Sequence, residues 1–151
     1  MSNKKKRIIF TSGTFDLINR GHINILERSK ALGDILIVGV STDSLVQSYK
    51  KVKPIISYSD RVKIVSSFKY VDRVVKQTEL MSIDLLKEYS VDCATIGSDW
   101  YNKYLPGLEW MKKHGEVVYL PYTKSISTTV IKRRIIENSY KIIKAELMRE
   151  K

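Results

Sequence analysis

The sequence is poor in the residues that mark secreted, fibrous and linker-rich proteins. Its 151 residues include one cysteine, three prolines and seven glycines. The single thiol, Cys93, excludes a disulfide framework and a cysteine metal site within one chain. Cys93 lies in the apolar stretch 91–96, and we interpret it as a small buried core residue. Nothing reads as a long linker, and the length suits one ordinary domain with its own core.

Long hydrophobic runs are also missing. The basic N-terminal residues 1–7 are followed by an apolar run of only three residues. That run is too short for the hydrophobic region of a signal peptide, and no stretch is long enough to cross a bilayer. We therefore expect a cytoplasmic protein without a membrane partner, in which the basic cluster is a solvated leader to the first strand.

Acidic side chains are outnumbered by basic ones. The chain has 27 lysines and arginines against 16 aspartates and glutamates, a formal net charge of +11. This balance favours polyanionic partners such as nucleotides, phosphorylated small molecules or nucleic acids. A nucleic-acid-binding module ranks lowest among these, because the sequence has no recognisable binding motif and no aromatic stacking platform with interleaved basic residues.

Strand-like and helix-like segments alternate along the chain. The continuously apolar segment 35–41 is typical of a strand that is buried on both faces. Strands are also expected at 7–12, 71–75, 93–97 and 116–120, and helices at 22–32, from 59 onwards, at 83–89, 108–113 and 127–136. This alternation predicts a single-domain α/β fold, a doubly wound parallel sheet of the Rossmann-like kind. Residues 1–136 would form the domain, and residues 137–151 a C-terminal helical extension of it.

The most informative segment is the strand, glycine-bearing turn and helix start of residues 11–22. Free N–H groups and the positive dipole end of such a helix form an anion site. Gly13 allows close backbone approach, Asp16 supplies a carboxylate, and a protonated His22 would neutralise charge on a phosphate. The alternative is a helix cap at Asp16 and an exposed histidine. Further nucleotide-binding candidates in this segment are Ser12, Thr14, Phe15 and Gly21.

A second candidate phosphate site follows the last strand. Ser127, Thr128 and Thr129 offer three consecutive hydroxyl groups at a helix start, although ordinary helix capping explains them equally well in isolation. Ligands of doubly wound sheets bind at the carboxyl ends of the strands. The loops 13–22, 97–100 and 121–129 are therefore expected to meet at one crevice.

Two further segments carry candidate side chains. Lys50, Lys51 and Lys53 lie in a predicted loop spanning 49–54, and a mobile lysine such as Lys50 is suited to follow phosphates as they move apart. A solvated charge run is the alternative for that loop. Asp99, just beyond a predicted strand, would hold a ribose hydroxyl or an amine, with a plain turn as its alternative.

Together these motifs resemble the nucleotidyltransferase superfamily with a His-x-Gly-His signature and a distal Ile-Ser-Thr-Thr, and within it the glycerol-3-phosphate cytidylyltransferases. The likeness runs from about residue 8 to residue 136. It rests on Gly13-Thr14-Phe15-Asp16-Leu17, Leu26-Glu27-Arg28, Leu32-Gly33-Asp34, Ser41-Thr42-Asp43, Tyr70-Val71-Asp72, Asp99-Trp100, the segment 116–121 and Ile126-Ser127-Thr128-Thr129.

The resemblance implies an in-line attack by a phosphorylated alcohol on the α-phosphate of CTP, with Mg²⁺ bound alongside the triphosphate and no residue assigned as a metal ligand. By position, His22 would stabilise the reacting phosphate, and the three hydroxyl residues 127–129 would hold the β- and γ-phosphates. Lys50 would reach both substrates, Asp99 would lie in the nucleotide pocket, and Asp16 near the reacting phosphates. The resemblance also implies a homodimer and a role in cell-surface polysaccharide biosynthesis.

Three positions depart from the pattern. The first signature histidine is Asn19 here, a neutral donor that we keep as a candidate catalytic residue. The arginine expected four residues before the Ile-Ser-Thr-Thr is Tyr122, with Lys124 as a possible replacement. The arginine expected before Tyr-Val-Asp is Lys69, a similar charge without the fork. These departures keep open an adenylyltransferase that uses ATP and a sugar phosphate, or a catalytically weakened nucleotide-binding protein.

Overall fold

Five parallel strands form one sheet in the order β3-β2-β1-β4-β5. The computed structural model describes residues 5–149. The strands are β1 (Ile8–Gly13), β2 (Ile35–Ser41), β3 (Arg73–Gln77), β4 (Cys93–Gly97) and β5 (Glu116–Leu120). The last two and β2 have the predicted bounds, whereas β1 lies one residue and β3 two residues further along than predicted. The order reverses beside β1, so the crevice of this doubly wound sheet opens between β1 and β4.

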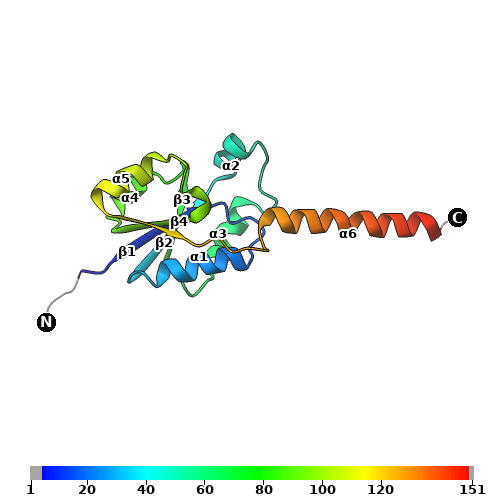
Figure 1. The fold of residues 1–151 in the computed structure, drawn as a ribbon, viewed down its shortest axis with the longest axis horizontal. Coiled ribbons are helices and arrows are strands. Elements are labelled where there is room, and N and C mark those ends of the chain that lie inside the picture. Colours follow the sequence, from blue (N-terminus) through cyan, green and yellow to red (C-terminus); the bar gives the residue numbers. More distant parts are fainter. Residues whose placement is uncertain (1–4, 150–151) are drawn as a thin grey trace.

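Helices cover both faces of the sheet (Figure 1). Helices α1 (Arg20–Lys30) and α3 (Tyr58–Ser66) pack on one face, and α4 (Ile83–Glu88) and α5 (Pro106–His114) on the other. Alternate residues of β1 serve the two layers: Ile9 packs with Leu26 of α1, and Phe10 with Met111 of α5. The predicted α/β fold is confirmed. Cys93 is buried in β4, as expected.

Two shorter elements follow strands at the crevice. Helix α2 (Asp43–Lys50) follows β2 and ends in the left-handed residue Lys51, with a φ of 61°. Lys50 is thus the last residue of a helix, not part of a loop as predicted, so its backbone is fixed. A single 3-10 turn, η1 (Ser98–Trp100), follows β4.

The last helix, α6 (Thr128–Arg149), differs from the others because none of its residues is buried. Its 22 residues make it about 33 Å long. It runs from the crevice out beyond the body of the domain (Figure 1). The predicted helix 127–136 and the predicted extension beyond it form one uninterrupted helix. The ends of that extension and of the predicted leader, residues 150–151 and 1–4, lie outside the described residues.

Within residues 5–149, no helix combines the length and the apolar character that spanning a bilayer requires.

Candidate active site

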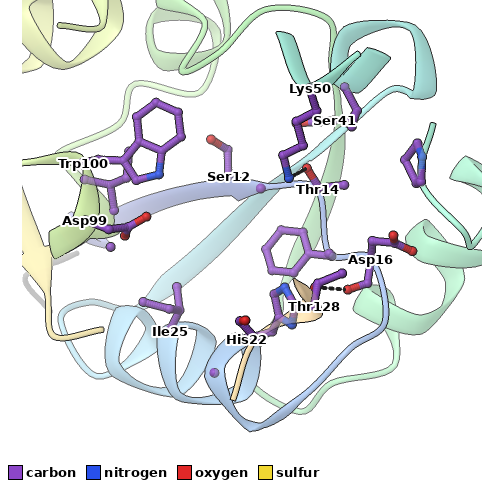
Figure 2. A pocket seen from close by; sticks show the side chains of 18 of the residues that line it. Ser12, Thr14, Asp16, His22, Ile25, Ser41, Lys50, Asp99, Trp100 and Thr128 are labelled. Atoms are coloured by element: carbon purple, nitrogen blue, oxygen red, sulfur yellow. Dashed lines mark hydrogen bonds between the residues drawn. The ribbon is translucent and has the colours of Figure 1, made fainter. Parts of the chain in front are cut away.

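A cavity of about 420 Å³ opens at the carboxyl ends of the strands. The three loops that were expected to meet there all line it, and so do the start of α6 and the end of α2. Figure 2 shows Asp99 and Trp100 on one side, Asp16 and Thr128 on the other, and His22 between them. The volume lies in the range of small-molecule sites.

The loop after β1 has a strained backbone. Phe15 and Leu17 adopt left-handed conformations with φ of 55° and 45°, which are uncommon for residues with a side chain. A Cβ at Gly13 would lie 3.2 Å from the Phe15 ring, so glycine makes room for that ring. The buried Phe15 ring in turn lies 5.6 Å from the imidazole of His22, centroid to centroid. The strained loop therefore packs the Phe15 ring against His22.

Asn19 and His22 form a capping box at the start of α1. The Oδ1 atom of Asn19 accepts a hydrogen bond from the Gly21 N–H at 2.9 Å, and its Nδ2 donates to the Leu17 carbonyl at 3.2 Å. The Asn19 backbone N–H donates to Nδ1 of His22 at 3.2 Å. Both ends of the Asn19 amide are thus occupied, and the bond to Nδ1 leaves the imidazole proton on Nε2.

The environment of His22 keeps its imidazole neutral. Burial lowers its pKa to about 4, assisted by the nearby cation of Lys50 and opposed by Asp16. The expected protonated imidazole concerned a site that holds a phosphate, and it stays a prediction.

The helix α1 begins at Arg20, two residues earlier than predicted, which makes His22 its third residue.

Asp16 joins three segments of the chain. It is 4% exposed, and its two oxygens accept hydrogen bonds from the N–H groups of Ile55 and Ile56, each at 3.0 Å. Lys132 of α6 lies 3.2 Å from the same carboxylate. Burial acts to raise the pKa of Asp16, but these N–H groups and Lys132 outweigh it and lower that pKa. Asp16 is thus an ionised anchor and not a cap of α1.

The two predicted phosphate-binding motifs are held together by direct bonds. The Thr128 hydroxyl donates to the Asp16 carbonyl at 2.7 Å (Figure 2), and Asn24 donates to Thr123 at 2.9 Å. Ser127 precedes α6, and its Oγ accepts the Val130 N–H at 3.2 Å. Ser127, Thr128 and Thr129 all line the cavity, as do Gly21 and His22 at the start of α1. The free N–H groups of both helix starts therefore serve one space.

Lys50 points from the end of α2 toward this space (Figure 2). Its Nζ lies 3.4 Å from Thr14 Oγ1, which also bonds to the Tyr49 hydroxyl at 3.2 Å. Removal from water and the cation of Lys132 lower the pKa of Lys50. A phosphate bound beside Lys50 would favour the charged form of this side chain.

The remaining predicted residues divide into two groups. Ser12, Gly21, Asp99 and Tyr122 line the cavity, and the Tyr122 N–H donates to Ser98 Oγ at 3.2 Å. Lys69 and Lys124 do not line it.

Lys69 lies beyond α3 with its Nζ 5.1 Å above the Tyr70 ring, and Lys124 is an exposed loop residue. Lys124 is therefore not in a position to replace the missing arginine from within the cavity wall.

Sequence reasoning missed Lys132 and the buried Arg61. Lys132 stands four residues after Thr128, so helical spacing alone puts both on one face. Arg61 is fully buried and donates to the carbonyls of Thr14 and Ile56, as well as to the Asp43 carboxylate at 2.6 Å. Its spacing of four from the core residue Val65 is the signal that it faces inward.

A polar pair at the ends of β2 and β3 was also missed. Ser41 is 1% exposed and Gln77 is fully buried, and both line the cavity. The Gln77 amide donates to Ser41 Oγ at 3.0 Å, and its Oε1 has no partner among the described residues. A buried amide oxygen without a partner is costly, so a donor from a ligand is the natural complement.

A Mg²⁺ ion would depend on the substrate phosphates for its ligands. Residues 5–149 contain no group of three or more histidine, cysteine, aspartate or glutamate side chains arranged to hold a metal. Mg²⁺ commonly keeps several waters and binds one or two carboxylates together with phosphate oxygens. Asp16 and Asp99 on opposite sides of the cavity fit that sparse pattern.

Comparisons with known proteins agree with the fold and the motifs. A sequence model described as cytidylyltransferase-like matches residues 10–134. Glycerol-3-phosphate cytidylyltransferase of Bacillus subtilis (strain 168) is 42% identical over 129 residues, covering 84% of this chain and 95% of that protein. The bifunctional protein HldE of Helicobacter pylori (strain Shi470) is 37% identical over 136 residues, which span 89% of this chain and 29% of HldE.

A solved structure supports the same assignment. The lipopolysaccharide core biosynthesis protein from Thermoplasma volcanium GSS1 superimposes with a TM-score of 0.65 at 28% identity, covering 81% of this chain and all of that one. The match of the family model over most of the chain, including both phosphate-binding motifs, is decisive. The chain belongs to the cytidylyltransferase-like family of nucleotidyltransferases.

Proposed function

We propose that the protein joins CTP and a small phosphorylated alcohol, with glycerol 3-phosphate as the first choice, to give a CDP-alcohol and pyrophosphate. The observation that carries this proposal is that the starts of α1 and α6 line one cavity together with Lys50 and Lys132. The 42% identical relative named for glycerol 3-phosphate and cytidylyl transfer supports the choice of substrates.

The reaction is a direct displacement at phosphorus. A phosphate oxygen of the alcohol attacks the α-phosphorus of CTP, and a new P–O bond forms. The bond from that phosphorus to the bridging oxygen breaks, and the pyrophosphate leaves with the electron pair. No covalent enzyme intermediate is needed. His22 donates from Nε2–H to an α-phosphate oxygen, where charge builds up in the transition state.

The remaining groups hold the substrates in line. The hydroxyl groups of Ser127 and Thr129 and the N–H groups of residues 127–129 bind the β- and γ-phosphates, and Lys50 contacts both substrates. The Thr128 hydroxyl keeps its bond to the Asp16 carbonyl. Asp16 or Asp99 would hold Mg²⁺ together with the substrate phosphates, and the ion would neutralise part of the phosphate charge. Asn19 acts as a positioning residue that fixes the His22 tautomer.

The experiment that tests this function is pyrophosphate release with CTP or ATP and a panel of phosphorylated alcohols. We expect CTP with glycerol 3-phosphate to turn over fastest, and His22→Gln to lower kcat about 100- to 1,000-fold. Lys63→Ala, an exposed change on α3, is the matched control and is expected to keep full activity. Release of no pyrophosphate with any pair would leave a nucleotide-binding protein and overturn the proposal.

The second candidate is an adenylyltransferase that acts on a sugar phosphate. Tyr122 favours it, because the neutral side chain stands at the cavity wall where the cytidylyltransferase pattern has an arginine. A preference for ATP in the same assay would select this candidate.

We further infer that Ser41 and Gln77 bind a hydroxyl group of the alcohol. A hydroxyl both donates and accepts, so it satisfies the amide in either orientation. Gln77→Leu is therefore expected to raise KM for the alcohol roughly tenfold, the equivalent of one lost hydrogen bond, while KM for CTP stays within experimental error. Gln47→Leu, an exposed glutamine on α2, is the control. An equal rise in both KM values would contradict this assignment.

The proposed product indicates a cellular setting. A CDP-alcohol is an activated donor, so we propose a role in cell-surface polysaccharide biosynthesis, in the cytoplasm where CTP is found. A homodimer is part of the same proposal.

A further inference from the structure

Helix α6 carries an exposed apolar line that nothing in the described chain covers. Ile136, Tyr140, Ile143 and Leu147 recur at alternating steps of four and three residues, and they are 69%, 66%, 55% and 61% exposed. We name these four residues the seam. They follow the matched family region, which ends at residue 134. The helix passes no other element along this length (Figure 1).

The spacing of the seam is that of a coiled coil. Steps of four and three place apolar residues on one narrow stripe, which packs knobs into holes against a second helix. In heptad positions, Ile136 and Ile143 occupy d, and Tyr140 and Leu147 occupy a. Glu137 and Lys144 follow the d residues and occupy the flanking e positions.

We propose that the seam is the interface for α6 of a second copy of this chain, packed antiparallel. In that register Ile136 faces Leu147 of the partner subunit, and Tyr140 faces Ile143 of the partner subunit. Antiparallel pairs bring e positions together, so Glu137 meets Lys144 of the partner subunit, and the two-fold axis repeats that ion pair. The surface is thus complementary to itself in both shape and charge.

A parallel pair fits the same residues less well. Isoleucine at d with leucine at a shifts parallel coiled coils toward more than two strands. A parallel register would also pair Glu137 with Lys132 of the partner subunit, yet Lys132 lies 3.2 Å from Asp16 in the cavity wall. The antiparallel arrangement leaves the first turn of α6 free for its role in the active site.

A membrane surface is a poorer occupant than a second copy. Helices that lie on membranes present one broad apolar face. Outside the seam, Ile135 and Ile142 are separated from it by Ser139 and Glu146 on one side, and Met148 by Lys144 on the other. A narrow stripe with charge on both flanks is the pattern of a helix pair.

The test measures the molecular mass of the full chain in solution by analytical ultracentrifugation. Ile143→Glu places a carboxylate at the centre of the seam and is expected to halve the mass. Ala145→Glu, on the opposite side of the same helix, is the matched control and is expected to keep the mass. Circular dichroism checks that each variant keeps the helix content of the wild type. Pyrophosphate release reports separately on the active site.

Exchanging the charges of Glu137 and Lys144 tests the antiparallel register. Glu137→Lys and Lys144→Glu alone each create like-charge pairs and should weaken association roughly tenfold. The double variant E137K/K144E should restore it. Failure of the double variant to restore association overturns the antiparallel register. An unchanged mass for Ile143→Glu, or seam-dependent binding to phosphatidylglycerol-containing vesicles by a monomeric wild type, overturns the interface itself.

Discussion

At the scale of single residues, the site depends on which atoms are already occupied. Asn19 stands where the superfamily signature has a histidine, and its amide is bonded to Gly21 and Leu17. Its backbone N–H holds Nδ1 of His22. The loss of the first signature histidine therefore leaves intact the arrangement that orients the second one, and Nε2 of His22 remains the free donor.

The lowered pKa of His22 predicts a pH-dependent stability. The unfolded chain protonates this imidazole near pH 6.5, and the folded protein only near pH 4. Between these values the unfolded state binds more protons, so the free energy of unfolding falls as the pH drops through this window. The contribution of the neutral imidazole to the free energy of unfolding is complete above pH 6.5 and amounts to about 3 kcal/mol. Urea denaturation of the wild type and His22→Gln at pH 7 and pH 4.5 measures it.

The comparison of the two proteins isolates the effect. We expect the wild type to lose more stability than His22→Gln on acidification, because glutamine does not titrate. Asp16 does not interfere, since its lowered pKa confines its titration to more acidic solution. Parallel losses in the two proteins would contradict a buried neutral imidazole.

At the scale of elements, Arg61 connects α3 to both neighbours in the site. Its guanidinium bonds to Asp43 at the start of α2, to the Thr14 carbonyl in the loop after β1, and to the Ile56 carbonyl at 3.0 Å. One planar group with five N–H donors satisfies three acceptors, which lysine does not reproduce. The strained loop beneath His22 is thus held from α3.

Removal of this connection is expected to be costly. Arg61→Met leaves buried acceptors without donors, and we expect a loss of about 3–5 kcal/mol in the free energy of unfolding. Lys63→Met, two residues away on the exposed face of α3, should stay within about 0.5 kcal/mol of the wild type. Chemical denaturation measures both. A loss for Arg61→Met no greater than that of the control would show that water replaces the guanidinium.

The strands, most of the helices and the position of the crevice were predictable from the sequence. The side-chain contacts that connect these elements were not. Continuously apolar runs such as residues 35–41 predicted the strands, because parallel strands are buried on both faces. Lys69 was misplaced because a matching motif position does not fix where a long side chain points. The role of Arg61 was missed because its partners Thr14 and Asp43 are 47 and 18 residues away in sequence. Contacts of this range depend on tertiary packing.

At the scale of the whole molecule, the active site joins the first and last thirds of the chain. Helix α6 has no buried residue, and its first turn is attached through Thr128 and Lys132 to Asp16. Beside it, Arg28 donates to the Pro121 carbonyl at 3.1 Å. The contacts that attach this helix of about 33 Å lie at its start, so a ligand that bridges the two sides adds to the stability of the fold.

A bound triphosphate should therefore stabilise the protein measurably. At a ligand concentration one hundred times Kd, binding adds about 2.7 kcal/mol, which corresponds to a rise in Tm of roughly 5–11 °C for a chain of this size. We expect this rise with CTP and Mg²⁺ in a thermal denaturation assay. The net charge of +11 adds a salt dependence, because added ions screen the attraction for the anionic ligand.

Substitution of two lysines of α6 distinguishes a ligand that bridges α6 and the loop of Asp16 from one that is attracted only by the net positive charge. Lys132→Met removes the cation beside Asp16 and should reduce the rise in Tm by more than half. Lys141→Met removes the same charge from an exposed position beyond the cavity, and should reproduce the wild-type rise. Equal reductions of the rise in Tm in both variants would mean that ligand binding depends on the overall charge and not on the contact between Lys132 and Asp16. A reduction confined to Lys132→Met would establish that one anion is held from both ends of the chain.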